Sequence, residues 1–409
     1  MTFPHGVWGV GPSGSYEALA DRFRPLFARI REGAAKREVT RTLPFEEIGL
    51  LREAGFTALR VPQRFGGAGV TLPEFFALLT ELAAADSNLP QALRSHFAFI
   101  EDVVNAPESP QRDAWLTRLG GGELVGGAWT EIGNAVVGTF DTRVTRNGSG
   151  LVLTGKKYYT TGSLYADWIE VGAIDDAGES VMVRVPRSAA GIDIADDWDG
   201  FGQILTASGT AVFDKVPVAD EDVIGDGNRF RYSAAFFQTV HLATLAGIAR
   251  AAASDVAAAV AERRRTFSHA AAPVAAQDPQ ILQVVGKVHS HAYAAGAIVE
   301  KATAALERAA LAHGAGDEAA EEAANIAAEI EVAQAQTVVT SLVLEATTVL
   351  FDALGASATS RPKALDRYWR NARTLSSHNP RIYKDRIVGD YAVNGTLPPF
   401  QWTIGATPT

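Results

Sequence analysis

Cysteine is absent from this 409-residue chain, and methionine occurs only twice. Without cysteine the chain can form no disulfide bond, no thiolate nucleophile and no cysteine-ligated metal site. No His-Glu-x-x-His motif or carboxylate cluster of metal-site form occurs, and His289 and His291 are two residues apart, which points them to different sides of a helix. We therefore predict no metal site.

Three other features are missing. We find no uninterrupted apolar run of membrane-spanning length, and no basic segment followed by an apolar one at the N-terminus. No Gly-x-Gly-x-x-Gly follows an expected strand, so a Rossmann site for NAD(P)H is not predicted. The formal net charge of -10 disfavours nucleic acid, which binds cationic surfaces. We expect a cytoplasmic protein that uses neither a membrane nor nucleic acid.

The first part of the chain has the apolar spacing of helices, from about residue 15 to residue 120. Pro44 precedes an expected helix over 45–54, and the aromatic-rich stretch 96–104 favours another. Thr71 and Glu74 have the spacing of a capping box, with Pro73 where a missing N–H costs little. One early stripe is expected to form a single helical face: Tyr16, Leu19, Ala20, Phe23, Leu26 and Phe27. These patterns predict an N-terminal α-helical domain over residues 1–122.

The pattern changes to short β-prone runs between residues 125 and 223. Asn147-Gly148 separates two such runs and predicts a β-hairpin. Several short strands divided by turns are typical of a small barrel or sandwich. We assign this central β-domain to residues 123–227.

The last part of the chain is alanine-rich and helical in its spacing. Four segments are candidates, over 229–263, 278–312, 317–352 and 361–376. Long amphipathic helices with short connections predict a four-helix bundle. We assign the bundle and the tail to residues 228–409.

Two polar segments of the β-region are candidates for binding a flat ligand. The first, 126–135, contains Trp129, Thr130 and Asn134, and the second, 155–163, contains Thr160, Thr161 and Gly162. Hydroxyl groups and backbone N–H groups there could bond the carbonyls of a heterocycle. Each segment alone is equally typical of an ordinary turn or strand.

Together these segments resemble motifs of the acyl-CoA dehydrogenase superfamily, in which a Thr-Glu loop and a later Gly-x-Lys strand hold a flavin ring. A third segment, over 198–209, is similar to the one that lines the flavin and substrate. The resemblance runs over about residues 15–395. It implies an α+β fold with a helical domain, a β-barrel and a four-helix bundle. By this resemblance Trp129, Thr130, Thr160, Thr161 and Gly162 contact the flavin.

The segment 370–380 lacks the glutamate that dehydrogenases of this superfamily use as a base. A carboxylate of that kind removes the α-proton of a thioester, so its absence disfavours dehydrogenation. The segments 365–374, 378–380 and 201–203 look instead like the dibenzothiophene-monooxygenase branch. That branch takes reduced FMN, or FAD in some members, from a separate NAD(P)H-dependent reductase. Its C4a-hydroperoxyflavin, formed with O2, transfers one oxygen atom.

The same resemblance implies catalytic roles for four residues. His378 occupies the branch's His-x-Pro position, and His96 matches a histidine in an aromatic N-terminal helix. Asn134 and Thr161 match groups that hold the reactive region of the flavin, where fixed dipoles stabilise developing charge. Leu375 stands where the branch often has a second histidine.

The flavin phosphate requires cations, and the segment 263–267 resembles an Arg-x-Phe element that reaches it across a subunit interface. Arg265 and Phe267 are the matching residues, and Gly355, Ala356 and Ser357 resemble the loop that meets the neighbour's flavin. The resemblance therefore implies a homo-oligomer, usually a tetramer.

The preferred hypothesis is a two-component flavin-dependent monooxygenase that acts on a small, mainly apolar substrate, either an organosulfur compound or an amine. The alternative is an FAD-dependent acyl-CoA dehydrogenase with a relocated base. A third possibility, a binding protein without catalysis, is disfavoured by the retained flavin motifs. The remaining histidines have no partner pattern and are expected to be structural or surface residues: His5, His241, His269 and His313.

Overall fold

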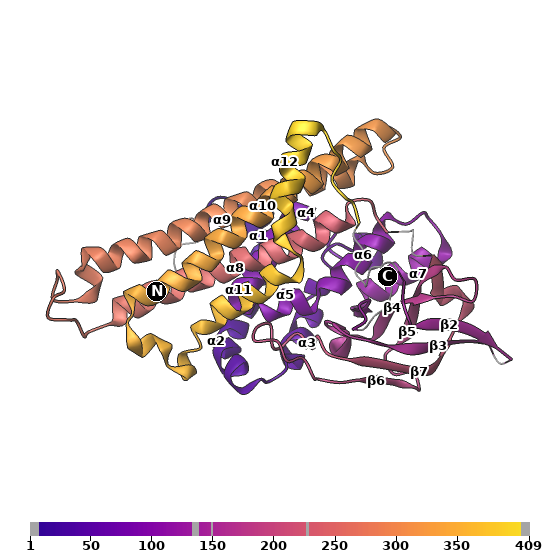
Figure 1. The fold of residues 1–409 in the computed structure, drawn as a ribbon, viewed down its shortest axis with the longest axis horizontal. Coiled ribbons are helices and arrows are strands. Elements are labelled where there is room, and N and C mark those ends of the chain that lie inside the picture. Colours follow the sequence, from indigo (N-terminus) through magenta and orange to yellow (C-terminus); the bar gives the residue numbers. More distant parts are fainter. Residues whose placement is uncertain (1–7, 133–138, 149, 226–228, 402–409) are drawn as a thin grey trace, which may run out of the picture.

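The computed structural model describes residues 8–132, 139–148, 150–225 and 229–401. Figure 1 shows a bundle of long helices at one end of the long axis and a β-sheet at the other. The N-terminal helices bridge these two parts, because α4 packs on the bundle helix α8 and α6 packs on strand β1. Segments from all three parts therefore meet in the middle of the molecule.

The N-terminal helices are short and mostly buried on one face. The stripe that predicted one continuous helix is divided between two helices, because Pro25 lies in the first turn of the second and cannot donate a backbone hydrogen bond. The bounds are α1 (Tyr16–Ala20), α2 (Arg24–Thr40), α3 (Phe45–Glu53), α4 (Leu72–Ala85), α5 (Asn88–Ala92), α6 (Arg94–Asn105) and α7 (Pro110–Gly120).

Helix α4 begins with the predicted capping box. The Thr71 side chain accepts a hydrogen bond from the backbone N–H of Glu74, and the Glu74 carboxylate accepts from the backbone N–H of Thr71 at 3.0 Å. Each side chain satisfies a backbone group that the helix leaves free. The prediction is confirmed.

The central part is one mixed sheet with the strand order β6-β7-β3-β2-β4-β5-β8, and β1 pairs with β4 in parallel. Strands β2 and β3 form the predicted antiparallel hairpin, in which Asn147 faces Gly150. Among the described residues, the hydrogen-bonded path ends at β6 and at β8. The bounds are β1 (Val125–Ala128), β2 (Arg143–Asn147), β3 (Gly150–Lys157), β4 (Trp168–Ile174), β5 (Ser180–Pro186), β6 (Ile192–Ile194), β7 (Ala211–Val218) and β8 (Val223–Gly225).

The C-terminal part contains α8 (Ser233–Glu262), α9 (Pro279–Ala312), α10 (Glu318–Val349), α11 (Asp366–His378) and α12 (Lys384–Asn394). Helix α11 begins five residues later than predicted, because Pro362 lies in a 3-10 turn and Ala364 has the left-handed φ of 49°. The sequence did not predict α12.

Helix α8 forms the centre of the bundle and contacts α4, α9 and α10. Among the described residues it is the one helix that is long and apolar enough to cross a membrane, which corrects the expectation that no stretch would be. In the fold, 67% of its apolar window is buried inside the protein. Its apolar surface therefore serves the core.

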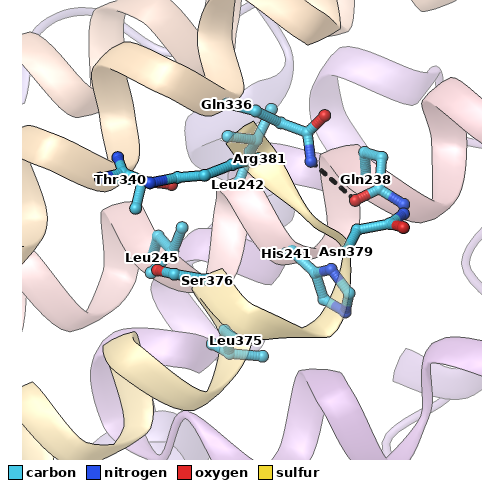
Figure 2. Close-up of a pocket in the computed structure, with 10 residues that line it drawn as sticks. All are labelled: Gln238, His241, Leu242, Leu245, Gln336, Thr340, Leu375, Ser376, Asn379 and Arg381. Carbon is cyan, nitrogen blue, oxygen red and sulfur yellow. Dashed lines mark hydrogen bonds between the residues drawn. The ribbon is translucent and has the colours of Figure 1, made fainter. Parts of the chain in front are cut away.

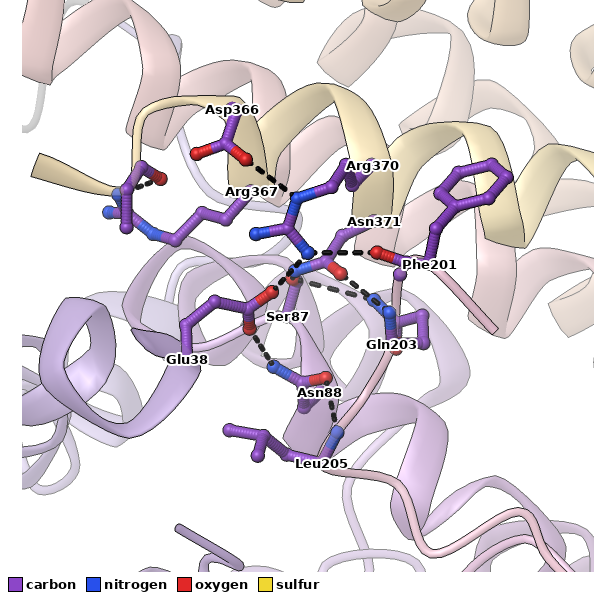
Figure 3. A network of polar contacts seen from close by, with 12 residues as sticks. Glu38, Ser87, Asn88, Phe201, Gln203, Leu205, Asp366, Arg367, Arg370 and Asn371 are labelled. Atoms are coloured by element: carbon purple, nitrogen blue, oxygen red, sulfur yellow. Dashed lines mark hydrogen bonds and ion pairs between the residues drawn. The ribbon is translucent and has the colours of Figure 1, made fainter. Parts of the chain in front are cut away.

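A polar network joins the three parts of the chain (Figure 3). Asn371 of α11 accepts a hydrogen bond from the backbone N–H of Gln203 at 2.6 Å and donates to Ser87 at 3.2 Å. Asn88 accepts from the backbone N–H of Leu205 at 3.3 Å. Because these donors and acceptors are buried, losing a partner would be costly. The network therefore fixes the segment 201–209 between the N-terminal helices and α11.

Candidate active site

The segment 206–208 continues from this network into a chain of buried hydroxyl groups. Thr206 donates to the carbonyl of Gln203 at 2.8 Å, because a carbonyl can only accept. Ser208 must then donate to Thr206, at 2.7 Å, and Thr161 must donate to Ser208, at 2.8 Å. Each hydroxyl has one hydrogen, so the chain leaves the Thr161 oxygen as an acceptor.

The neighbours of Thr161 hold the loop against the N-terminal helices. Gly162 has a φ of 80°, and a Cβ on it would lie 1.9 Å from the carbonyl oxygen of Ala92. Both the backbone N–H and the hydroxyl of Thr160 donate to the carbonyl of Gly209, at 3.2 and 3.0 Å. The structure thus gives Thr160 a contact to the protein backbone, and it brings Thr161 next to the turn between α5 and α6.

Trp129 and Thr130 follow β1 and are anchored by the residues around them. The Lys157 ammonium donates to the carbonyl of Trp129 at 3.2 Å, and the Tyr158 N–H donates to the carbonyl of Thr130 at 2.8 Å. Lys157 also forms a buried ion pair with Glu131 at 2.7 Å. Burial lowers the pKa of Lys157 to about 8, although Glu131 opposes the shift. The ion pair therefore connects the Thr-Glu loop to the end of β3.

His378, Arg94 and His241 meet at the end of α11. The Arg94 guanidinium lies 3.4 Å from Nε2 of His378, and the ring centroids of His378 and His241 are 4.6 Å apart. Arg94 also donates to the carbonyl of Phe237 at 3.4 Å and lies over its ring, 4.5 Å from the centroid. The catalytic role of His378 stays a prediction. The structure places His378 beside two side chains, Arg94 and His241, that the sequence did not assign to the site.

The contacts of His378 define its protonation. Arginine can only donate, so Nε2 of His378 carries a lone pair. The ring retains exposed surface, but surrounding protein atoms and the Arg94 charge lower its pKa to about 3. His378 is therefore a neutral imidazole at pH 7 whose Nε2 accepts a hydrogen bond, and it is a weak base while Arg94 lies beside it.

His241 lies on the wall of a small pocket between α8, α10 and the end of α11 (Figure 2). Its Nε2 is 2.9 Å from the side-chain oxygen of Gln91, so Nε2 carries the hydrogen. Burial and the charge of Arg94 hold the pKa of His241 well below its usual value. Leu375 lines the same pocket, so an imidazole from α8 lies beside the position where the branch has a second histidine on α11.

His96 lies two residues after Arg94 on α6, and such residues point to different sides of a helix. Its Nε2 is 3.0 Å from the carbonyl of Thr57, and its Nδ1 accepts from the N–H of Val125 at 3.3 Å. Both ring nitrogens are thus used by backbone groups. Arg94 is on the side of α6 that meets His378. His96 is on another side, where it joins the N-terminal helices to β1.

The environment of His96 predicts a pH-dependent stability. Burial lowers its folded-state pKa to about 4, against about 6.5 in an unfolded chain. Between these values the unfolded chain binds a proton that the folded chain does not, so stability falls as the pH falls. The free energy of unfolding that is lost through His96 over this whole pH range is about 3 kcal/mol. In urea titrations from pH 7 to pH 4, His96→Gln should show a shallower loss of stability than wild type. Equal slopes in His96→Gln and wild type would contradict this assignment.

Asn134, the remaining catalytic candidate, lies outside the described residues. The phosphate-binding candidates are described and lie together. A Cβ on Gly355 would lie 3.7 Å from the Phe267 ring and 3.6 Å from the Arg263 guanidinium, which donates to the carbonyl of Ala353 at 3.0 Å. Arg265 and Phe267 are exposed. The two segments that the resemblance paired thus contact each other.

These segments lie far from Thr161 in the same chain. The segment 263–267 follows the C-terminal end of α8, and the segment 355–357 follows α10 and a 3-10 turn. Both lie at the end of the bundle opposite the sheet (Figure 1). Helix α8 has 30 residues and spans about 45 Å at 1.5 Å per residue. One copy of the chain therefore cannot place both sets of residues on one flavin.

A second and larger pocket lies between the N-terminal helices and the bundle. Trp8, Tyr16, Arg250 and Glu300 are among its lining residues. None of the residues predicted from the sequence as catalytic or flavin-binding lines this pocket. It lies apart from the contacts of His378 described above.

Two family models match this chain, one in its N-terminal part and one in its C-terminal part. Residues 15–123 match the acyl-CoA dehydrogenase N-terminal domain, and residues 239–380 match the acyl-CoA dehydrogenase C-terminal domain. A probable FMNH2-dependent monooxygenase, SfnC of Pseudomonas putida, is 27% identical over 92% of this chain and 94% of its own length. Dibenzothiophene monooxygenase of Mycolicibacterium goodii is 27% identical over 86% of this chain and 88% of its own length.

Solved structures agree with these matches. FMN-bound TdsC from Paenibacillus sp. A11-2 has a TM-score of 0.84 and 26% identity, over 94% of this chain and 99% of its own. Methanesulfinate monooxygenase MsuC from Pseudomonas fluorescens has a TM-score of 0.84 and 25% identity, over 93% and 98%. The predicted fold is confirmed. The chain belongs to the acyl-CoA dehydrogenase superfamily, in the branch of flavin-dependent monooxygenases that contains dibenzothiophene monooxygenase.

Proposed function

We propose that this protein is the oxygenase component of a two-component system. It binds reduced FMN delivered by a separate NAD(P)H-dependent reductase and uses O2 to add one oxygen atom to a small organosulfur compound. The observation that carries this proposal is the neutral His378 at the end of α11, where Arg94 and His241 are its neighbours. The relatives named above, of which one is FMNH2-dependent and one is FMN-bound, support the choice of cofactor. The dependence on NAD(P)H supports a cytoplasmic location.

The residues around Thr161 fit the ring of reduced FMN. Reduced FMN has a hydrogen on N5, and the hydroxyl chain leaves the Thr161 oxygen as an acceptor. We assign Thr161, Gly162, Trp129 and Thr130 to the ring. Thr160 would hold the segment after β3 in place through its hydrogen bonds to the carbonyl of Gly209.

When bound, reduced FMN supplies the two electrons that activate O2. The residues of the chain would orient the reactants and handle protons around it. His378 offers a neutral Nε2 as a hydrogen-bond and proton acceptor, and Thr161 offers a fixed acceptor. The buried surroundings of Thr161 would limit access of water and thus the release of H2O2.

The dehydrogenase alternative requires a carboxylate base beside the flavin. Among the residues that the structure describes, neither Arg94 nor His378 forms an ion pair with a carboxylate. The segment 370–380 also contains no carboxylate, and both observations favour oxygenation over removal of an α-proton.

We propose that a second copy of the chain completes the flavin site with Arg265, Phe267, Gly355, Ala356 and Ser357. Arg265 would bind the FMN phosphate, because a guanidinium pairs well with phosphate oxygens. The separation along α8 supports this assignment, and a tetramer is the assembly that we expect.

Loss of the phosphate contact should be specific to FMN. Arg265→Ala should weaken FMN binding about 10- to 100-fold, the usual effect of losing a charge-assisted hydrogen bond. Riboflavin has no phosphate, so its affinity should change little. Flavin fluorescence titration measures both constants, with Arg143→Ala as a control for an exposed arginine of β2. An equal loss of affinity for both flavins would argue against the phosphate assignment.

The proposed function is tested by supplying reduced FMN from a reductase with NADH and O2. Sulfur and nitrogen compounds are added, and product and H2O2 are measured against NADH consumed. We expect at least one sulfur compound to divert a major share of the electrons from H2O2 into an oxygenated product. Stoichiometric H2O2 with every compound would refute the proposal.

A further inference from the structure

Among the described residues, the Arg94 guanidinium is surrounded by protein atoms but has no carboxylate partner. Within the described parts of the chain its side chain contacts the carbonyl and ring of Phe237 and Nε2 of His378, and no ion pair to it is formed. Burial and, to a smaller extent, the charge of Arg229 lower the pKa of Arg94 to about 9. The positive charge of the Arg94 guanidinium is therefore not balanced by a negative charge among its described contacts.

The neighbouring Arg229 shows how such a charge is compensated elsewhere in the same region. It forms ion pairs with Asp102 at 2.7 Å and with Glu170 at 3.1 Å, and its guanidinium lies over the Trp129 ring at 4.8 Å. Taking a charge from water is costly unless an opposite charge and hydrogen bonds replace the lost hydration. Arg229 has two carboxylates for this purpose, and Arg94 has only neutral partners.

The partners of Arg94 are also ones that a ligand can share or displace. The distance of 3.4 Å to His378 and that of 3.4 Å to the Phe237 carbonyl are both at the long end for hydrogen bonds. The Phe237 ring gives the guanidinium an apolar neighbour. Arg94 therefore combines donors for an oxyanion with an adjacent surface for a hydrocarbon group.

We propose that Arg94 binds the anionic head of the substrate, and that the substrate is a small organic anion of the alkanesulfinate class. This inference rests on the proposed function and names its substrate. It narrows the expected class of organosulfur substrates to an anionic one. A sulfinate fits because it carries both an oxyanion for Arg94 and an oxidisable sulfur with a lone pair.

The reaction balances with the reactants already named. Alkanesulfinate, reduced FMN and O2 give alkanesulfonate, oxidised FMN and water. One oxygen atom forms a new S–O bond, and the other leaves as water with the two hydrogens of reduced FMN. Sulfur loses the two electrons that, with the two from FMN, reduce O2. Binding of the anion would draw Arg94 away from His378 and free its Nε2 for a proton.

The test measures binding without turnover, in the protein that carries oxidised FMN. Methanesulfinate is titrated by calorimetry into wild type, Arg94→Gln and Arg94→Lys, with Arg143→Gln as a matched loss of one positive charge on an exposed strand. We expect Arg94→Gln to weaken binding about 10- to 100-fold and Arg94→Lys to weaken it less. Dimethyl sulfone, which is similar in size but neutral, should bind both forms equally. No methanesulfinate binding to wild type, or equal binding to Arg94→Gln, would overturn the inference.

Turnover separates this inference from the proposed function. If the reductase-coupled enzyme oxygenates dibenzothiophene and leaves methanesulfinate unchanged, the inference is wrong and the oxygenase function stands. If methanesulfinate binds through Arg94 and every electron still goes to H2O2, the anion site stands and the oxygenase function is wrong.

Discussion

His378→Gln should lower kcat/KM for oxygenation by about 100-fold or more, the usual contribution of a positioned acid or base. The wild-type imidazole is neutral at pH 7 and presents a lone pair on Nε2 beside Arg94. A glutamine amide can accept a hydrogen bond there but cannot take up a proton. Consumption of O2 should continue, and H2O2 should replace the oxygenated product. Product and H2O2 are measured with reductase-supplied FMN over a range of substrate concentrations that extends below KM.

A structural role for His378 would give a different pattern. His378→Gln should leave the affinity for FMN and the melting temperature close to wild type, because the ring retains exposed surface. His313→Gln removes a histidine that pairs with Glu321 at 3.0 Å, away from the described site, and should retain full activity. An unchanged ratio of product to H2O2 in His378→Gln would remove His378 from the mechanism.

Glu131→Gln should destabilise the protein by about 3–5 kcal/mol, the usual cost of leaving a buried charge without its partner. Lys157 is completely buried and pairs with Glu131 at 2.7 Å. The Glu131 carboxylate also accepts from Thr142, at 2.7 Å from its hydroxyl and 3.0 Å from its N–H, and from the N–H of Asp141 at 2.7 Å. A glutamine has one acceptor oxygen, so it cannot satisfy all of these donors. Urea unfolding at pH 7 measures the change.

The second variant that tests this ion pair removes both charges. Lys157→Met combined with Glu131→Gln should recover part of the lost stability, because no unpaired ammonium remains. The deficit of Glu131→Gln should also narrow as the pH rises toward 8, since the isolated Lys157 ammonium then loses its proton more easily. A double variant that is less stable than Glu131→Gln would show that packing, and not charge, dominates.

Local signals predicted most of the elements. The capping box at Thr71 and the Asn147-Gly148 turn were readable because their partners are within a few residues. The long bundle helices were readable from their periodicity. The division between α1 and α2 depended on Pro25, which the apolar stripe concealed. Short helix α12 lacks a strong stripe and was missed.

The site was predicted less completely, because its residues come together only through tertiary packing. The resemblance selected His378 and Thr161, and the structure places both at the junction of the three parts. It did not select Arg94 or His241, which reach His378 from α6 and α8. An arginine next to the aromatic-rich stretch 96–104 was the available signal, but neither its burial nor its pairing with distant carboxylates can be read from sequence. His96 was also selected, but its ring nitrogens contact backbone groups of Thr57 and Val125. Arg94, two residues earlier on α6, is the side chain that lies beside His378.

The most direct measurement follows the fate of oxygen. The protein is supplied with reduced FMN, methanesulfinate and 18O2, and the product is analysed by mass spectrometry. The account predicts methanesulfonate that carries one 18O atom, formed by wild type and strongly reduced in both Arg94→Gln and His378→Gln. Methanesulfonate without 18O, or all of the 18O recovered in H2O2, would contradict it.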